Sequence, residues 1–339
     1  MREPPGTERP ISRDAPPHPL VAIVGPTGSG KSALALRIAA EFAGEIVNCD
    51  SLQVFRYFDI GTAKLQPSAR SGIPHHLIDI VDPDALFTAG EFARLAREAI
   101  TGISSRAHLP ILAGGTGFYL TALLEGLFPG PTRDENLRRR LAERERRRAG
   151  SLHRLLGRFD RETAARIHPN DIPKVTRALE VCLLSRRPAS ELFREGRLGL
   201  AGYRTLKLAL LPERDALYER LDQRTEEIFA AGLVAEVGGI LAMGYPPSAK
   251  PFESHGYKQA LQLLAGELNP REALFYAQRN TRNYAKRQIT WFRREKDLVW
   301  LKGFGEEPPI ISEALARVAR FLKNTSSRGA TPPPEPLTP

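Results

Sequence analysis

Short apolar runs alternate with longer amphipathic stretches along most of the chain. Runs at 20–24, 45–49, 76–81, 110–114, 205–211 and 298–301 have the length and near-continuous hydrophobicity of buried strands. Helical patterns at 31–42, 89–101 and 117–125 follow several of these runs. The alternation predicts an α/β fold in which helices flank a parallel sheet.

The alternation stops between residues 128 and 202. This stretch opens with RDENLRRRLAERERRR and continues as helical patterns without a strand. We therefore expect an all-helical insertion at 128–202, placed between two parts of the α/β core at 20–127 and 203–323. The two ends, 1–19 and 324–339, are rich in proline and poor in apolar residues, and we expect both to be disordered tails.

Composition and charge narrow the class of protein. The 339 residues have a net charge of +10, which favours a polyanionic partner such as nucleic acid. The 2 cysteines cannot form a disulfide framework and suit a reducing compartment. The sequence contains no signal-peptide core and no apolar stretch of membrane-spanning length, so we expect a cytoplasmic protein without a membrane partner.

The first candidate site is a glycine-rich loop. The stretch GPTGSGKS fits the phosphate-binding pattern G-x-x-x-x-G-K-[ST], with a predicted strand before it and a predicted helix after it. In that context Lys31 adds a charge and Ser32 can ligate Mg²⁺; a chance glycine-rich turn is the alternative. The predicted phosphate-binding residues are Gly25, Pro26, Thr27, Gly28, Ser29, Gly30, Lys31 and Ser32.

A carboxylate lies in an unusual place for a nucleotide hydrolase. Such enzymes need an acid at the end of a neighbouring strand, but the run at 110–114 ends in a neutral Gly-Gly-Thr-Gly turn. Asp50 instead follows the run at 45–49, and the carboxyl ends of parallel strands share one edge of a sheet. Asp50 could bind metal or act as a base there. A turn or helix cap made by Asp50-Ser51 is the structural alternative.

Two basic segments bear on the choice of partner. Residues 133–148 hold eight arginines against four acids, and residues 279–296 hold seven Lys or Arg with Tyr284, Trp291 and Phe292 among them. Such segments suit phosphate contacts and base stacking. By spacing alone they are more typical of solvated helix faces whose aromatic residues point to the core, although two such runs in one basic protein make a nucleic-acid groove more plausible.

Taken together, several segments resemble the tRNA dimethylallyltransferases, also called tRNA isopentenyltransferases. They are GPTGSGKSALA, NCDSLQVFRYFDIGTAKL, PHHLIDIVDP, LAGGTGFYL, IHPNDIPKVTRALEV, GYKQAL and KRQITWFR, in the order that the family has them. The resemblance implies transfer of a dimethylallyl group from dimethylallyl diphosphate to the exocyclic amine of the adenosine immediately 3′ of the anticodon. It implies a P-loop core with a helical insertion that binds the anticodon stem-loop of tRNA. We expect Mg²⁺ as cofactor, held at Ser32, and a monomer that binds one tRNA.

The resemblance also assigns roles to residues. Asp50 becomes the general base, and Thr27, Lys31 and Arg224 stabilise the leaving diphosphate. His255 stands where an aliphatic residue usually precedes Gly256-Tyr257, and we expect a packed or solvent-facing imidazole there. The positions implied to contact tRNA are Asp50, Ser51, Leu52, Gln53, Thr116, Arg138, Lys174, Arg177, Gly256, Tyr257, Lys258, Lys286, Arg287, Gln288, Trp291 and Arg293.

Two other functions remain open at this stage. An adenylate isopentenyltransferase, which acts on free AMP or ATP, would share the P-loop and the acid but would need neither the basic insertion nor KRQITWFR. A P-loop kinase or a nucleotide-switched RNA-binding protein would need a metal-binding acid that the strand ends do not offer.

Overall fold

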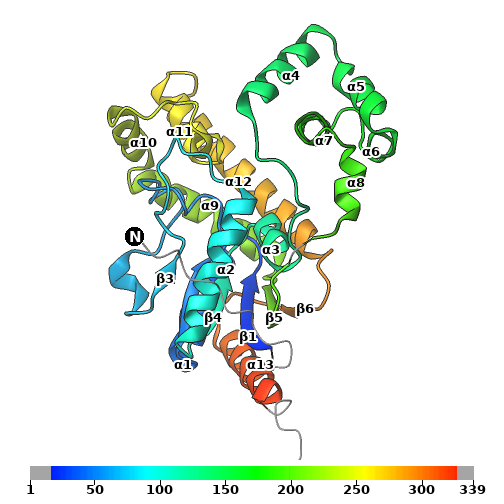
Figure 1. Ribbon diagram of the computed structural model, residues 1–339. Helices are drawn as coiled ribbons and strands as arrows, with labels where there is room; N and C mark the ends of the chain where they lie inside the picture. Colours follow the sequence, from blue (N-terminus) through cyan, green and yellow to red (C-terminus); the bar gives the residue numbers. More distant parts are fainter. Residues whose placement is uncertain (1–16, 198, 327–339) are drawn as a thin grey trace, which may run out of the picture. The chain divides into compact units, whose positions relative to one another are not determined.

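One parallel sheet organises the larger part of the molecule. The computed structural model describes residues 17–197 and 199–326, and these contain a six-stranded sheet of order β3-β2-β4-β1-β5-β6 in which each pairing is parallel (Figure 1). The predicted α/β fold with a parallel sheet is confirmed. Its strands are β1 (His18–Val24), β2 (Gly44–Asn48), β3 (His75–His76), β4 (Leu109–Ala113), β5 (Tyr203–Leu210) and β6 (Leu298–Leu301).

Helices cover both faces of the sheet. Alternate side chains, among them Ile23 of β1 and Ile111 of β4, pack against α1 (Lys31–Glu41) and α13 (Pro308–Ser326). The intervening side chains face α2 (Ala89–Ser105), whose apolar residues are buried. This burial on both sides explains why the strand sequences are almost continuously apolar.

The remaining helices of this unit surround the carboxyl ends of the strands. They are α3 (Gly117–Leu124), α9 (Arg214–Ala230), α10 (Leu233–Ala242), α11 (Tyr257–Leu264) and α12 (Pro270–Phe292), with short 3-10 turns η1 (Pro67–Arg70) and η2 (Lys250–Glu253). A second apolar core joins Val54 and Phe58, from the loop after β2, to Val237, Phe252 and Tyr257. The loop that follows Asp50 is thereby packed against α10 and α11.

The helical insertion is a compact unit of its own, formed by residues 124–200. Its predicted bounds were 128–202. The difference arises because the amide of Leu200 donates to the carbonyl of Leu124 at 3.2 Å, whereas the carbonyl of Gly202 accepts from His18 at the start of the sheet. Its helices are α4 (Glu135–Arg147), α5 (Ser151–Phe159), α6 (Arg161–Arg166), α7 (Ile172–Ser185) and α8 (Ala189–Arg194).

The predicted strand at 76–81 is wrong beyond its first residue. In this segment, only His75 and His76 pair with β2. The φ angles of Leu77 and Asp79 are 62° and 56°, and these turn the chain out of the extended conformation. The Asn48 amide holds this turn by donating to the carbonyl of Leu77 at 2.9 Å. Hydrophobicity alone does not reveal such a turn.

The predicted tails mostly lie outside the described residues, namely 1–16 and 327–339. Where they overlap the structure, the predicted bounds are wrong. Residues 18 and 19 extend β1, because they pair with Tyr203 and Arg204 of β5, and residues 324–326 continue α13. No helix within the described ranges has the length and hydrophobicity needed to cross a membrane.

A buried carboxylate on β2 joins this strand to neighbouring segments of the sheet. The Glu45 side chain is only 3% exposed, and both of its oxygens accept hydrogen bonds from Arg106, with His76 at 2.7 Å and His108 at 2.8 Å. Burial alone would raise the pKa of Glu45, but the donors from His76, Arg106 and His108 lower it to about 2. The ionised form is therefore part of the folded state.

We expect Glu45→Gln to lower the free energy of unfolding by about 2 kcal/mol at pH 7, because Arg106, His76 and His108 lose a buried, charged acceptor. The folded-state pKa lies below the ordinary value of 4.5, so this contribution is present above pH 4.5 and is lost as the pH falls toward 2. Urea unfolding at pH 7 and pH 3 measures both effects, with the exposed Glu41→Gln as control. An equal loss in the control would contradict the assignment.

Candidate active site

The glycine-rich loop lies between β1 and α1 and has the shape that an anion requires. Gly25, Gly28 and Gly30 have φ of 139°, 76° and 86°, and Gly30 caps α1 without a side-chain hydrogen bond. The first amides of α1 are therefore left for a ligand. The Lys31 ammonium donates to the carbonyl of Pro26 at 2.6 Å, which folds this side chain back over the loop.

The end of β2 touches the end of β4 beside this loop. The amide of Thr116 donates to the carbonyl of Cys49 at 3.2 Å, and the Thr116 hydroxyl accepts from the amide of Ser51 at 3.0 Å. A methyl group on Gly114 would lie 2.1 Å from the Cys49 carbonyl oxygen, so only glycine permits this approach. The neutral Gly-Gly-Thr-Gly turn thus supports the segment that carries Asp50.

Asp50 occupies the edge of the sheet where the sequence predicted it. Its Oδ1 accepts from the amides of Leu52 at 2.8 Å and Gln53 at 3.4 Å, so the carboxylate also organises the following turn. The structural alternative, a turn organised by Asp50, is therefore confirmed, and the functional role of Asp50 stays a prediction. Asp50 shares a cavity of about 310 Å³ with Thr27, Lys31, Ser32, Asn48, Gln53, Arg220 and Arg224.

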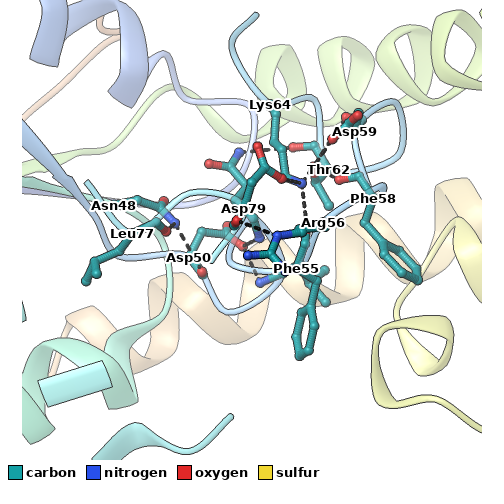
Figure 2. A network of polar contacts seen from close by, with 12 residues as sticks. Asn48, Asp50, Phe55, Arg56, Phe58, Asp59, Thr62, Lys64, Leu77 and Asp79 are labelled. Atoms are coloured by element: carbon teal, nitrogen blue, oxygen red, sulfur yellow. Dashed lines mark hydrogen bonds and ion pairs between the residues drawn. The ribbon is translucent and has the colours of Figure 1, made fainter. Parts of the chain in front are cut away.

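A buried lysine, which the sequence prediction did not single out, fixes the loop after Asp50. The Lys64 ammonium donates to the carbonyl of Phe55 and to the carboxylates of Asp59 and Asp79, while its side chain is only 2% exposed (Figure 2). All three of its protons have acceptors, as a buried ammonium requires. The sequence signal that could have revealed this role is a lysine five residues after an aspartate in DIGTAK, since that aspartate, Asp59, is one of its two acidic partners.

Two cations converge on the cavity. Burial lowers the pKa of Lys31 to about 8; the charge of Asp50 opposes this shift and that of Arg224 adds to it. Burial also lowers the pKa of Arg224, and the neighbouring charge of Arg220 adds to that shift. An anion bound between Lys31 and Arg224 would stabilise their positively charged forms, which burial disfavours.

A neutral imidazole borders the same region. The ring of His255 lies 4.7 Å from that of Tyr284, and both line a small cavity of about 60 Å³ with Thr27, Asp50 and Arg224. Burial lowers the pKa of His255 to about 4 against the opposing charge of Asp50, so the imidazole is uncharged at neutral pH. This is the packed imidazole that the sequence predicted.

Helix α12 presents two distinct faces. Lys286, Arg287, Trp291 and Arg293 are exposed, whereas Phe292 is buried in the core. The two sequence interpretations of this segment therefore describe opposite sides of one helix. Lys258 of α11 is exposed as well.

Two residues predicted to contact RNA have structural roles instead. The buried Gln288 amide accepts from the amide of Thr27 and donates to the carbonyl of Gly115, both at 2.8 Å, which ties α12 to the phosphate loop. Tyr257 is completely buried, and its hydroxyl donates to Glu236 and accepts from Gly61. In this structure both side chains are buried and hydrogen-bonded within the protein.

Within the insertion, the predicted RNA contacts Arg138 and Arg177 bind a buried acid. Both guanidinium groups donate to Glu180, which is 0% exposed; the distances from Arg138 are 2.9 and 2.8 Å, and that from Arg177 is 2.6 Å. Burial alone would raise the pKa of Glu180. Hydrogen bonds, of which the one from Arg138 has the largest effect, lower this pKa to about 2. Lys174 is exposed and paired with Asp171. In the basic run 133–148, the exposed arginines are Arg133, Arg139, Arg140, Arg144, Arg146, Arg147 and Arg148.

Comparisons with known proteins agree with this geometry. The model of the IPP transferase family matches residues 53–295. The chain is 70% identical over 304 residues to the tRNA dimethylallyltransferase of Solibacter usitatus, covering 90% of this chain and 99% of that protein. It is 52% identical over 297 residues to that of Koribacter versatilis, covering 87% and 96%.

Solved structures give the same result. The tRNA isopentenylpyrophosphate transferase of Bacillus halodurans superposes with a TM-score of 0.68 at 36% identity, covering 91% of this chain and 98% of that one. A eukaryotic dimethylallyltransferase acting on tRNA superposes with a TM-score of 0.76 at 27% identity, covering 91% and 80%.

The lowered pKa of Lys31 makes anion binding pH-dependent. A bound diphosphate favours the charged ammonium, so above about pH 8 the free protein must take up a proton to bind it. We expect the affinity for inorganic diphosphate to fall between pH 7 and pH 9 relative to Lys31→Arg, whose guanidinium stays charged. Calorimetry in buffers of different ionisation enthalpy measures the proton uptake. Parallel pH profiles for the two proteins would contradict this prediction.

Proposed function

This chain belongs to the tRNA dimethylallyltransferase family, and on that premise we propose that it transfers a dimethylallyl group from dimethylallyl diphosphate to the exocyclic amine of the adenosine immediately 3′ of the anticodon. It is a tRNA-modifying prenyltransferase. The observation that carries the detailed proposal is the cavity of about 310 Å³ that the phosphate loop, Arg224 and Asp50 line together.

Asp50 supports the chemistry at the acceptor. The exocyclic amine of adenine is a poor nucleophile because its lone pair is delocalised into the ring. As the new N–C bond forms at the allylic carbon, the C–O bond to diphosphate breaks, and the amine proton passes to the Asp50 carboxylate. The amides of Leu52 and Gln53 hold Oδ1 of this carboxylate in place for that transfer.

The phosphate loop supports departure of the diphosphate. Negative charge grows on the diphosphate oxygens as the C–O bond breaks, and Lys31, Thr27, Arg224 and the first amides of α1 surround the site where it would lie. Ser32 lies in the same cavity, and a hydroxyl together with diphosphate oxygens suits Mg²⁺, which keeps several waters. Such an ion would neutralise part of the leaving-group charge.

No cluster of three or more His, Cys, Asp or Glu side chains suited to a metal ion occurs among residues 17–197 and 199–326. We propose that a Mg²⁺ at Ser32 would take its other ligands from diphosphate oxygens and water.

The exposed basic residues suit the RNA. The target base must leave the anticodon stack to reach a cavity of this kind. Lys286 and Arg287 lie on the exposed face of α12, which Gln288 ties to the phosphate loop, and the exposed Arg293 directly follows this helix. Trp291 offers a ring for stacking. We propose that these residues contact the anticodon stem-loop, and that the exposed arginines of α4 contact RNA phosphates.

The oligomeric state and the compartment are part of the proposal. We propose a monomer that acts on one tRNA in the cytoplasm; the free thiols of Cys49 and Cys182 suit a reducing compartment.

Supplying labelled dimethylallyl diphosphate with unmodified tRNA or with free AMP tests the proposal directly. We expect label in tRNA and none in AMP. Label in AMP alone would establish an adenylate isopentenyltransferase, and ATP turnover without label in either would establish a kinase.

We expect Asp50→Asn to lower the single-turnover rate by about 100-fold or more, because an amide cannot accept the proton. The Asn side-chain oxygen can still accept from Leu52, so the affinities for tRNA and for inorganic diphosphate should stay close to those of the wild type. The exposed Asp84→Asn serves as the control for loss of one carboxylate. Near-normal turnover in Asp50→Asn would leave Asp50 with a structural role alone.

We expect substitutions at the leaving-group site and substitutions on the RNA surface to affect the binding of different ligands. Thr27→Ala and Arg224→Ala should weaken diphosphate binding with little change in tRNA affinity. Arg287→Ala or Arg293→Ala should weaken tRNA binding by about 1 kcal/mol each and reduce the salt slope by about one unit. The exposed Arg317→Ala on α13 is the charge control. Equal effects of both sets on tRNA binding would refute this division.

A further inference from the structure

A second guanidinium lies one helical turn before Arg224. Arg220 lines the cavity that contains Lys31, Ser32 and Asp50, and its positive charge contributes to the lowered pKa of Arg224. Residues i and i+4 of a helix lie on the same face, so the two guanidinium groups are close to each other. Like charges at this spacing repel, and an anion bound between them would relieve the repulsion.

Arg220 has an acidic partner in the loop between β6 and α13. Its guanidinium donates to Oε1 of Glu306 and lies over the ring of Phe304, 4.7 Å from the ring centre. The same loop is joined to the phosphate loop, because the amide of Gly305 donates to the carbonyl of Ser29 at 2.9 Å. Both loops belong to the α/β core.

The Glu306 carboxylate also reaches the phosphate loop itself. A methyl group on Gly30 would lie 1.9 Å from Oε2 of Glu306, so this oxygen lies directly against the residue that caps α1. Gly30 offers no side chain as a cap, and the first amides of α1 attract negative charge. Glu306 thus brings an anion to the border of the site where a phosphate would bind.

We propose that Arg220 is a second guanidinium for the diphosphate and that Glu306 occupies it while the site is empty. This inference rests on the proposed function, since it needs a diphosphate at the loop. When the diphosphate binds, Arg220 exchanges the Glu306 carboxylate for phosphate oxygens. When the diphosphate leaves, Glu306 takes Arg220 back.

The exposure of the pair makes the exchange feasible. The side chains of Arg220 and Glu306 are 43% and 40% exposed, and ion pairs of that exposure are weak. A diphosphate carries more charge than a carboxylate and presents several oxygens to a guanidinium fork, so it competes well. Glu306 lowers the affinity for diphosphate mainly because it competes for Arg220. Release of the product is favoured for the same reason.

Binding of inorganic diphosphate to the full chain without RNA tests this exchange. By calorimetry at pH 7, we expect Glu306→Gln to tighten binding by about fivefold and Arg220→Ala to weaken it by about tenfold. In the Arg220→Ala background, Glu306→Gln should change the affinity by less than about twofold, because the competition is gone. Arg220→Lys should show an intermediate affinity, since it keeps the charge but loses the fork.

Two control variants match the changes in charge. Glu313→Gln removes an acid that pairs with Arg317 on α13, and Arg214→Ala removes a guanidinium that lies over Tyr218 on α9. Each should change the diphosphate affinity by less than about twofold. In turnover assays with tRNA, Glu306→Gln should increase product inhibition by diphosphate while the single-turnover rate stays within about twofold.

Two results would overturn the inference. One is a diphosphate affinity that depends on Lys31 but is unchanged in Glu306→Gln and Arg220→Ala. The other is an equal tightening by Glu306→Gln in the wild-type and Arg220→Ala backgrounds, which would mean simple repulsion. Failure of the proposed function is a separate result, because label absent from tRNA leaves these diphosphate affinities measurable.

Discussion

Parallel pairing directs the carboxyl ends of the strands to one edge of the sheet, and the candidate site depends on this constraint. β1 leads into the loop that ends at Lys31, β2 leads to Asp50, and β4 leads to the turn that contains Thr116. The approach of β2 and β4 is so close that Gly114 has no room for a side chain. Groups from three segments that are distant in sequence therefore meet at this edge. Helix α12 is joined to two of these segments by the hydrogen bonds of Gln288 to Thr27 and Gly115.

The same edge collects positive charge that the free protein must accommodate. Lys31, Arg220 and Arg224 lie around one cavity, and the lowered pKa values of Lys31 and Arg224 show that their charged forms are disfavoured there. Two carboxylates compensate part of this positive charge. Asp50 is the proposed base, and Glu306 lies beside the phosphate loop and pairs with Arg220. Such a site is built for its ligand at some cost to stability.

The sequence predicts local features well and distant partners poorly. The phosphate loop and Asp50 were predictable because motif, strand and helix are adjacent in the chain. The strand at 76–81 failed because positive φ at Leu77 and Asp79 leaves no mark on hydrophobicity. Arg138 could not be assigned from charge alone, because its partner Glu180 lies on another helix. Arg224 was found only through the family resemblance, since nothing in its own segment points to the cavity.

The position of the insertion affects how the chain folds during synthesis. The central strand β1 pairs with β5, which follows the whole insertion in sequence, and β6 follows later still. On the ribosome the sheet cannot close until the insertion has emerged, whereas the insertion has its own core and its helices make mostly local contacts. The nascent chain therefore carries β1 with one unpaired edge, the edge that later pairs with β5, for the time that it takes to make residues 124–200. In this period chaperones have a hydrophobic strand edge to bind.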